Sequence, residues 1–160
     1  MSILKNTNTN SVEEAATHLY EALNRQVATW SVLYTKLHHF HWYVKGPHFF
    51  RLHAKFEELY DEAAGHMDTI AERLLAIGGR PAATMAEYLQ LSIVREAEGQ
   101  SSAEEMVATV VSDLKLVASD LATGMQAAES AGDPSTADIL NGMLESVDKH
   151  IWMLNAFLGK

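Results

Sequence analysis

Four residues between positions 53 and 72 combine the side chains of metal ligands with a spacing that brings them together in pairs. His53 precedes Glu57 by four residues, and Asp68 precedes Glu72 by the same interval. Residues four apart lie on one face of a helix, so each pair could hold one metal ion with nitrogen or oxygen ligands. Any single one of them could instead belong to a solvated charged face, but the two pairs together indicate metal binding.

The two pairs lie too far apart to hold the same ion within one chain. His53 and Asp68 are fifteen residues apart, which on a helix is about 22 Å. If they share an ion, the pairs come from two chains, with two copies of this helix antiparallel across a two-fold axis. The spacing therefore raises the hypothesis of a site between subunits.

A single long helix over residues 47–79 is expected to carry both pairs. It opens with a proline, which suits a first helical turn, and closes on a Gly-Gly pair, which suits a helix C-terminus. Its apolar residues recur at steps of three and four, the pattern of a helix packed into a bundle. They are Leu52, Phe56, Leu59, Ala63, Met67, Ile70, Leu74 and Ile77. The ligand pairs lie about 140° around the helix from this apolar face.

Three further long helices and a short one are expected around it. Capping boxes that begin at Ser11 and at Ser101 or Ser102, and a proline directly after Asp133, mark the starts of the long ones. The connection after residue 79 has about twenty residues, which is too many for a bare loop and predicts the short helix. The expected spans are 11–44, 101–131 and 134–158, with the short helix at 85–91.

These elements predict an all-α fold, a ferritin-like four-helix bundle with a short extra helix in the long connection between helices two and three. A long crossover makes helices two and three parallel, as in ferritin-like folds, whereas short loops throughout would give up-down-up-down order. The length of 160 residues and the 48% hydrophobic content suit one well-buried core. We expect a flexible N-terminal arm over residues 1–10 and a single domain over residues 11–160.

The composition limits both the chemistry and the location. The chain has no cysteine, so any metal is held by nitrogen and oxygen, and the lack of disulfides fits a cytoplasmic protein. No stretch resembles a signal peptide or a membrane span. The net charge of −9 and the pI near 5.3 oppose generic attraction to DNA phosphates or anionic lipid and favour attraction of cations.

Histidines at the end of the first helix extend the set of candidate ligands. The short Gly-Pro turn brings His41 towards the start of the next helix, where His53 lies. His38 shares the face of His41, whereas His39 points elsewhere and could be a dipole partner at the helix C-terminus. Two imidazoles and three carboxylates suit iron or zinc, and open positions among oxygen-rich ligands favour redox iron.

Four segments of the chain match the motifs of a known family. They are HW at 41–42, KGPHFFRLHAKFEELYDE at 45–62, MDTIAERLLAIGG at 67–79 and TADIL at 136–140. With these segments the chain resembles the Dps family, the dodecameric mini-ferritins, over nearly its whole length. The resemblance implies a homo-oligomer, a dodecamer built from dimers, with two irons bound between two-fold-related subunits. One chain would supply His41, His53 and Glu57, and its partner would supply Asp68 and Glu72.

The resemblance also implies an activity. Such a protein is a ferroxidase that oxidises Fe(II), preferentially with hydrogen peroxide, and stores ferric mineral in a hollow shell, which protects against oxidative damage. The alternative is a nucleoid-associated, DNA-protecting structural protein, but the N-terminal arm has only Lys5 as a basic residue, which argues against direct DNA binding. A plain four-helix interaction module, in which the ligand stripe is accidental, is a third interpretation.

Several residues lie near the implied site or depart from the family pattern. Trp42 is a candidate electron donor or else a packing aromatic, and His38 is a candidate hydrogen-bond partner for a ligand carboxylate. Glu57 stands where many relatives have Asp. The candidates for an iron entry pore on a three-fold axis are Asp113, Asp120 and Asp133, although Asp133 could equally be a helix cap. His48 and His66 are either surface histidines or further metal-binding points.

Overall fold

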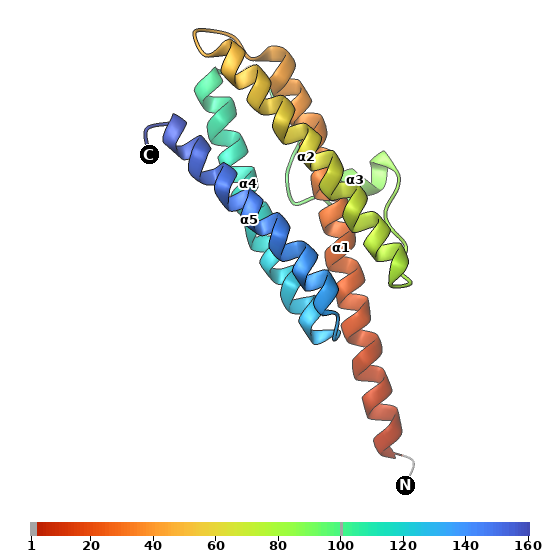
Figure 1. Ribbon diagram of the computed structural model, residues 1–160. Helices are drawn as coiled ribbons and strands as arrows, with labels where there is room; N and C mark the ends of the chain where they lie inside the picture. The colour runs from red at the N-terminus through yellow and green to blue at the C-terminus, as the bar shows by residue number, and fades with distance from the viewer. Residues whose placement is uncertain (1–2, 100) are drawn as a thin grey trace.

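The computed structural model describes residues 3–99 and 101–160, with side chains from residue 11 onward, and it contains five helices (Figure 1). They are α1 (Ile3–Tyr43), α2 (Phe49–Ala76), α3 (Met85–Leu91), α4 (Ala103–Ser130) and α5 (Pro134–Phe157). The described residues contain no strand, and none of their helices combines the length and the apolar character needed to cross a membrane. The predicted all-α fold, with a short extra helix in the long connection, is confirmed.

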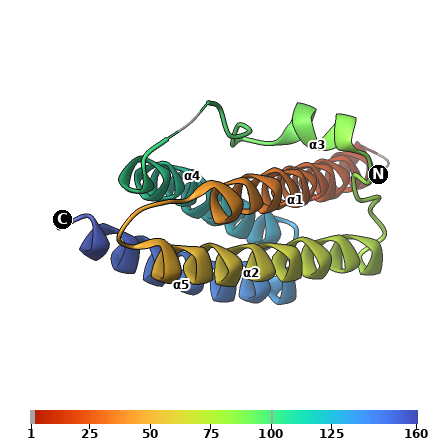
Figure 2. The same ribbon diagram turned by 90° about the horizontal axis from the view of Figure 1, so that it is seen from above.

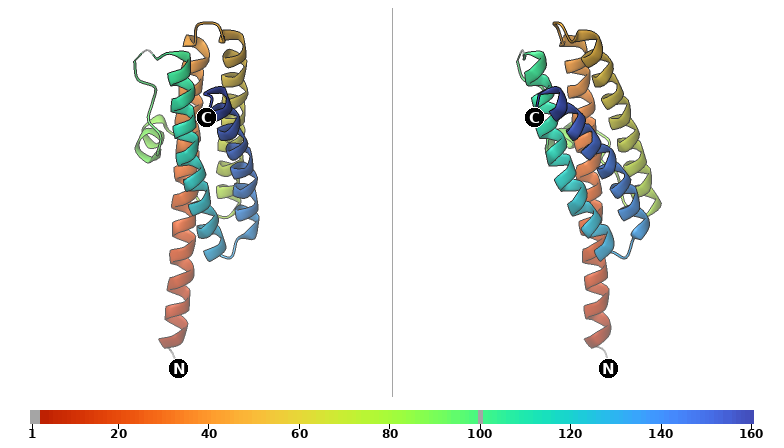
Figure 3. Two further views of the ribbon diagram at one scale, coloured as in Figure 1. Left: turned by 90° about the vertical axis from the view of Figure 1, so that its left-hand side faces the viewer. Right: turned by 60° about the vertical axis from the view of Figure 1, so that its left-hand side comes forward.

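The four long helices form a bundle of two antiparallel pairs (Figures 1 and 2). A short turn reverses the chain between α1 and α2, and another reverses it between α4 and α5. The connection that contains α3 packs beside α1 and returns the chain to the end of the bundle at which α2 began (Figure 3). Helices α2 and α4 therefore run in the same direction, as the long connection predicts.

Helix α1 begins earlier than its capping box predicts. The structure continues the helix back to Ile3, eight residues before Ser11, and this first part extends past the rest of the bundle (Figure 3). Residues 3–10 contain neither proline nor glycine, so nothing in their sequence ends a helix that packing further along has already started. Residues 1–2 lie outside the described residues, and the flexible arm and the single domain from residue 11 stay predictions.

The apolar face of α2 is buried, as its periodicity predicts. Met67 and Ile77 pack against the core from partly exposed positions, and the other six of the eight predicted residues are buried. They belong to one hydrophobic cluster with buried side chains of α1, α4 and α5. Because burial of one large apolar side chain contributes about 1.5–3 kcal/mol, this face determines which side of α2 turns inward. The side that carries the histidine and acidic pairs remains outside the core.

Helix α2 is shorter at both ends than the predicted helix over residues 47–79. At its start, Pro47 and His48 belong to the turn that follows α1, and the helix begins at Phe49. At its end, Gly78 has a φ of 89°, a left-handed conformation that favours glycine. Gly79 lies so close to the last turn that a Cβ there would lie 2.2 Å from Leu74 Cδ1. The Gly-Gly pair thus ends the helix, as predicted.

Asp113, one of the candidate pore residues, lies inside the bundle. Its carboxylate on α4 is 2.6 Å from the Lys36 ammonium on α1, and the two side chains are only 10% and 6% exposed. Burial raises the pKa of Asp113, and the hydrogen bond and charge of Lys36 oppose this rise. Because Asp113 is buried within one chain, its carboxylate does not reach a surface that could line a pore between chains, so the prediction for Asp113 is wrong.

The other two candidate pore carboxylates also have cationic partners within the chain. Asp120 lies 2.6 Å from Arg25 of α1, and Asp133 lies 2.7 Å from Arg73 of α2. Asp133 also accepts a hydrogen bond of 3.0 Å from the backbone N–H of Thr136, which makes it the N-cap of α5. The helix-cap interpretation of Asp133 is therefore confirmed.

A carboxylate with three hydrogen-bond donors joins α2 to α5. Glu62 accepts from His150 Nε2 at 2.5 Å, from His66 Nε2 at 3.1 Å and from the Ser146 hydroxyl. Lys55 Nζ lies 3.1 Å from His150 Nδ1, and because an ammonium only donates, Nε2 of His150 carries the hydrogen that Glu62 accepts. Burial opposes ionisation of Glu62, but these hydrogen bonds outweigh it and hold the pKa of its carboxyl far below the ordinary value.

Replacing Glu62 with glutamine should lower the free energy of unfolding at neutral pH by about 1.5–3 kcal/mol, the worth of hydrogen bonds to a charged group. A carboxyl whose pKa falls on folding adds stability that is present above its unfolded pKa, near 4.5, and is lost as the pH drops below it. The difference in urea midpoint between the two proteins should therefore shrink from pH 7 to pH 3. Glu58→Gln, on a side chain that is 58% exposed, is the control, and an equal loss in both variants would contradict the prediction.

Candidate metal centre

Three of the five predicted metal ligands converge in the structure. One ligand atom from each of His41 on α1 and His53 and Glu57 on α2 lies within 4.8 Å of the other two, and we call this group the trio. Among the described residues, no other group of three histidine or acidic side chains reaches this spacing. The turn between Tyr43 and Phe49 places the end of α1 beside the start of α2, as the Gly-Pro turn predicts.

Reciprocal hydrogen bonds hold the two imidazole rings. His41 Nδ1 lies 2.7 Å from the carbonyl oxygen of His53, and His53 Nδ1 lies 2.9 Å from the carbonyl oxygen of His41. A carbonyl oxygen only accepts, so each Nδ1 carries a hydrogen, and the tautomer of the neutral ring that makes this bond has its lone pair at Nε2. A hydrogen bond from one ring nitrogen is the usual way in which a histidine is oriented to bind a metal with the other.

The trio is buried on its histidine side and open on its carboxylate side. His41 is buried, His53 is partly exposed and Glu57 is exposed. The two imidazole rings are stacked, with centroids 3.6 Å apart and an angle of 19° between their planes. Because the described residues bring only three ligands together here, a metal bound at the trio would keep further positions for water or for other ligands.

The other two predicted ligands are separate from the trio. Asp68 and Glu72 are exposed on α2, and neither belongs to the group that converges. Asp68 follows Glu57 by eleven residues, about 16 Å along a helix. This distance is too long for two ligands of one ion, which agrees with the prediction that the two pairs do not share an ion within one chain.

The two residues predicted beside the site have different surroundings. Trp42 is 68% exposed, and its ring lies 5.2 Å from that of His38. His38 Nδ1 lies 3.0 Å from the carbonyl oxygen of Tyr34, and its ring stacks on Tyr60 with centroids 3.7 Å apart. None of these contacts joins His38 to a ligand carboxylate within the chain. The roles of Trp42 and His38 in the reaction stay predictions.

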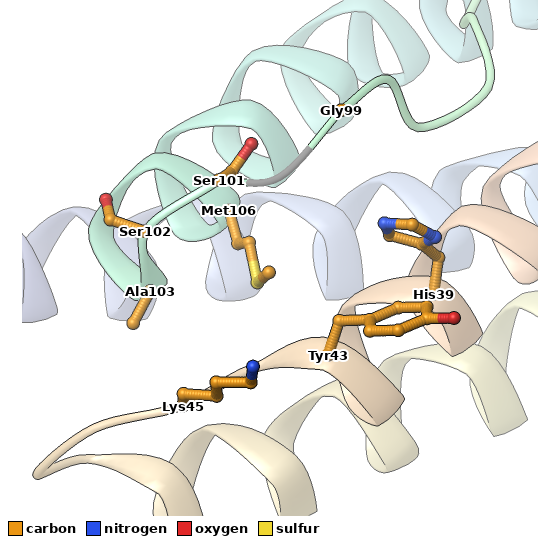
Figure 4. Close-up of a pocket in the computed structure, with 8 residues that line it drawn as sticks. All are labelled: His39, Tyr43, Lys45, Gly99, Ser101, Ser102, Ala103 and Met106. Atoms are coloured by element: carbon orange, nitrogen blue, oxygen red, sulfur yellow. The ribbon is translucent and has the colours of Figure 1, made fainter.

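A separate hollow of about 320 Å³ lies between the end of α1 and the start of α4 (Figure 4). It is lined by His39, Tyr43, Lys45, Gly99, Ser101, Ser102, Ala103 and Met106. His39 therefore lies apart from the trio, as predicted. None of the five predicted metal ligands lines this hollow.

Two aromatic residues that are not among the predicted site residues lie against the trio. The ring of Phe49 lies nearly parallel to that of His53, and the ring of Tyr60 meets His41 edge-on, with centroids 5.4 Å apart. Burial and nearby negative charges raise the pKa of Tyr60, so its phenol stays neutral. The four-residue spacing of Phe49 and His53 is the signal that could have identified their contact.

Comparisons with known proteins agree with this fold. A model of the ferritin-like domain matches residues 20–160. DNA protection during starvation protein 2 of Bacillus anthracis is 55% identical over 140 residues, which cover 88% of this chain and 96% of that protein.

Solved structures show the same similarity. The crystal structure of a Dps protein from Bacillus brevis matches with a TM-score of 0.89 and 51% identity over 91% of this chain and 97% of that one. The structure of Dps from Listeria innocua soaked with zinc matches with a TM-score of 0.86 and 42% identity over 89% of this chain and 97% of that one. The chain therefore belongs to the ferritin-like family and, within it, to the Dps proteins.

Proposed function

We propose that this protein is a ferroxidase that oxidises Fe(II) and stores it as ferric mineral. The observation that carries the proposal is the trio of His41, His53 and Glu57, in which each imidazole donates from Nδ1 and so leaves Nε2 for a metal, and the carboxylate faces solvent. Nitrogen and carboxylate ligands with open positions suit Fe(II), which arrives as the substrate. Membership of the Dps proteins supports the same activity.

The remaining ligands of this site would come from a second copy of the chain. A two-fold axis that lays two α2 helices side by side in opposite directions would bring Asp68 and Glu72 of one copy to the trio of the other. Their exposure on α2 supports this arrangement. Each of the two equal sites of such a dimer would hold two irons with two imidazoles and three carboxylates.

Hydrogen peroxide is the proposed oxidant. Two Fe(II) ions each give up one electron, and one peroxide takes both electrons and two protons, so that its O–O bond breaks and two waters form. Because both electrons arrive at one site, the one-electron reduction that would release a hydroxyl radical is avoided. The carboxylates stabilise the more highly charged ferric ions, and the imidazoles hold the geometry.

Storage of the product completes the proposal. The ferric mineral would lie inside a hollow dodecamer built from such dimers, in the cytoplasm. The name of the Bacillus anthracis relative states DNA protection for that protein, and here the removal of Fe(II) and peroxide would protect DNA without contact. The net charge of −9 argues against direct binding to DNA phosphates.

Stopped-flow measurement of Fe(II) oxidation by hydrogen peroxide tests this function. His53→Ala and Asp68→Ala should each lower the rate by more than about 10-fold, since the loss of even a hydrogen-bond partner of a metal ligand costs 10- to 100-fold. His39→Ala, on a histidine outside the trio, is the control and should keep the wild-type rate. Wild-type rates in all three variants would instead favour a four-helix module without a ferroxidase site.

A further inference from the structure

One aromatic side chain outside the ligand set contacts a ligand imidazole. The rings of Phe49 and His53 have centroids 5.0 Å apart and an angle of 26° between their planes. Phe49 is the first residue of α2, one helical turn before His53, and it packs against the hydrophobic core from a partly buried position. The His53 imidazole therefore has two ring neighbours nearly parallel to it, His41 and Phe49.

The orientation of the His53 ring decides where its free Nε2 points. The torsion between Cβ and an imidazole ring has broad minima, so the bond itself does not select one orientation. The carbonyl of His41 holds Nδ1 of this ring at one point. The Phe49 ring lies against the plane of the imidazole and packs against the core, so together with the stacked His41 ring it restricts the remaining rotation. A binding site is only as well oriented as the side chains that support its ligands.

We propose that Phe49 is a positioning residue of the metal centre, which holds the His53 imidazole with Nε2 directed to the metal. The inference rests on the proposed function in one respect, namely that His53 binds the metal. A residue that served only the core would affect the stability of the fold and leave metal affinity unchanged. Zinc affinity, which involves no redox step, therefore separates the two roles.

Isothermal titration of the full-length protein with zinc tests the positioning role. Phe49→Leu keeps an apolar side chain against the core but removes the ring. The worth of an aromatic contact corresponds to a fall of about 2- to 12-fold in zinc affinity, whereas Phe49→Tyr keeps the ring and should keep the affinity. Phe157→Leu is the control, because its ring contacts His48, a histidine outside the trio, with centroids 5.3 Å apart. Its zinc affinity should equal that of the wild type.

The zinc affinities of these variants show whether Phe49 positions the His53 imidazole or serves only the core. Equal affinity in Phe49→Leu and the wild type would overturn the positioning role, and so would a loss in Phe49→Leu that Phe49→Tyr fails to restore. Thermal unfolding shows whether each variant is folded, and Phe49→Met replaces Phe49→Leu if the leucine variant is not. Equal zinc affinity in His53→Ala and the wild type would be a different result, because it would overturn the proposed metal centre and this inference with it.

Discussion

Mixing equal amounts of His53→Ala and Asp68→Ala chains should restore about a quarter of the wild-type rate of Fe(II) oxidation, although each variant alone should fall more than about 10-fold below that rate. The reason is the proposed division of the site between two copies. Half of the dimers that form at random contain one chain of each kind. In such a dimer, one site combines the intact trio of the Asp68→Ala chain with the intact acidic pair of the His53→Ala chain. The other site carries both substitutions.

A mixture of His53→Ala with Glu57→Ala is the matched control. Both substitutions fall in the trio, so no site in any mixed dimer has a complete trio, and the rate should stay at the level of the single variants. Native mass spectrometry verifies that mixed dimers have formed. If neither mixture regains activity although mixed dimers are present, or if both regain it equally, the assignment of Asp68 and Glu72 to the second copy is wrong.

Replacing Lys36 with methionine should lower the free energy of unfolding by about 3–5 kcal/mol, the range for breaking a buried ion pair. Without the ammonium 2.6 Å away, the carboxylate of Asp113 must remain charged inside the bundle or take up a proton. Burial already raises its pKa against the opposing effect of Lys36, and the substitution should raise it further. A carboxyl with a raised pKa destabilises the fold above its unfolded pKa, so the loss should shrink as the pH falls.

Urea unfolding measures this loss, at one fixed protein concentration because the proposed assembly would also contribute to stability. The double variant Lys36→Met with Asp113→Leu should recover most of it, since it removes the unpaired charge. Arg25→Met breaks a more exposed pair, in which the arginine side chain is 32% exposed, and should cost less. A loss in Lys36→Met no larger than that in Arg25→Met would contradict the argument from burial.

Much of the fold could be predicted because it depends on residues close together in the sequence. The apolar face of α2 follows from its three-four spacing, and the parallel crossover follows from the length of the connection. Helix α3 follows from the same length, and the structure adds the capping box of Thr84 and Glu87 at its start. The approach of His41 to His53 also follows from a local feature, the short Gly-Pro turn between their helices.

Besides the ends of α2, two predictions differ from the structure for identifiable reasons. Helix α1 starts at Ile3 and not at Ser11. A capping box marks a position where a helix can begin, but the residues before the box decide whether the helix begins there or continues further back. Asp113 is buried against Lys36. The two residues lie 77 residues apart in the chain. A pair at that separation leaves no periodic pattern in the sequence, so only the packed bundle shows it.

By itself, the sequence determined the helices, the types of ligand and the separation of the two ligand pairs. These follow from the constant rise and rotation of an α-helix, which convert spacing in the chain into distance and face. Only the tertiary structure decided that His41 and His53 exchange hydrogen bonds through their carbonyls, which leaves each Nε2 free. It also decided that Phe49 lies against His53. These contacts depend on ring rotations and on packing across the turn, which neighbouring helices set and spacing along the chain does not encode.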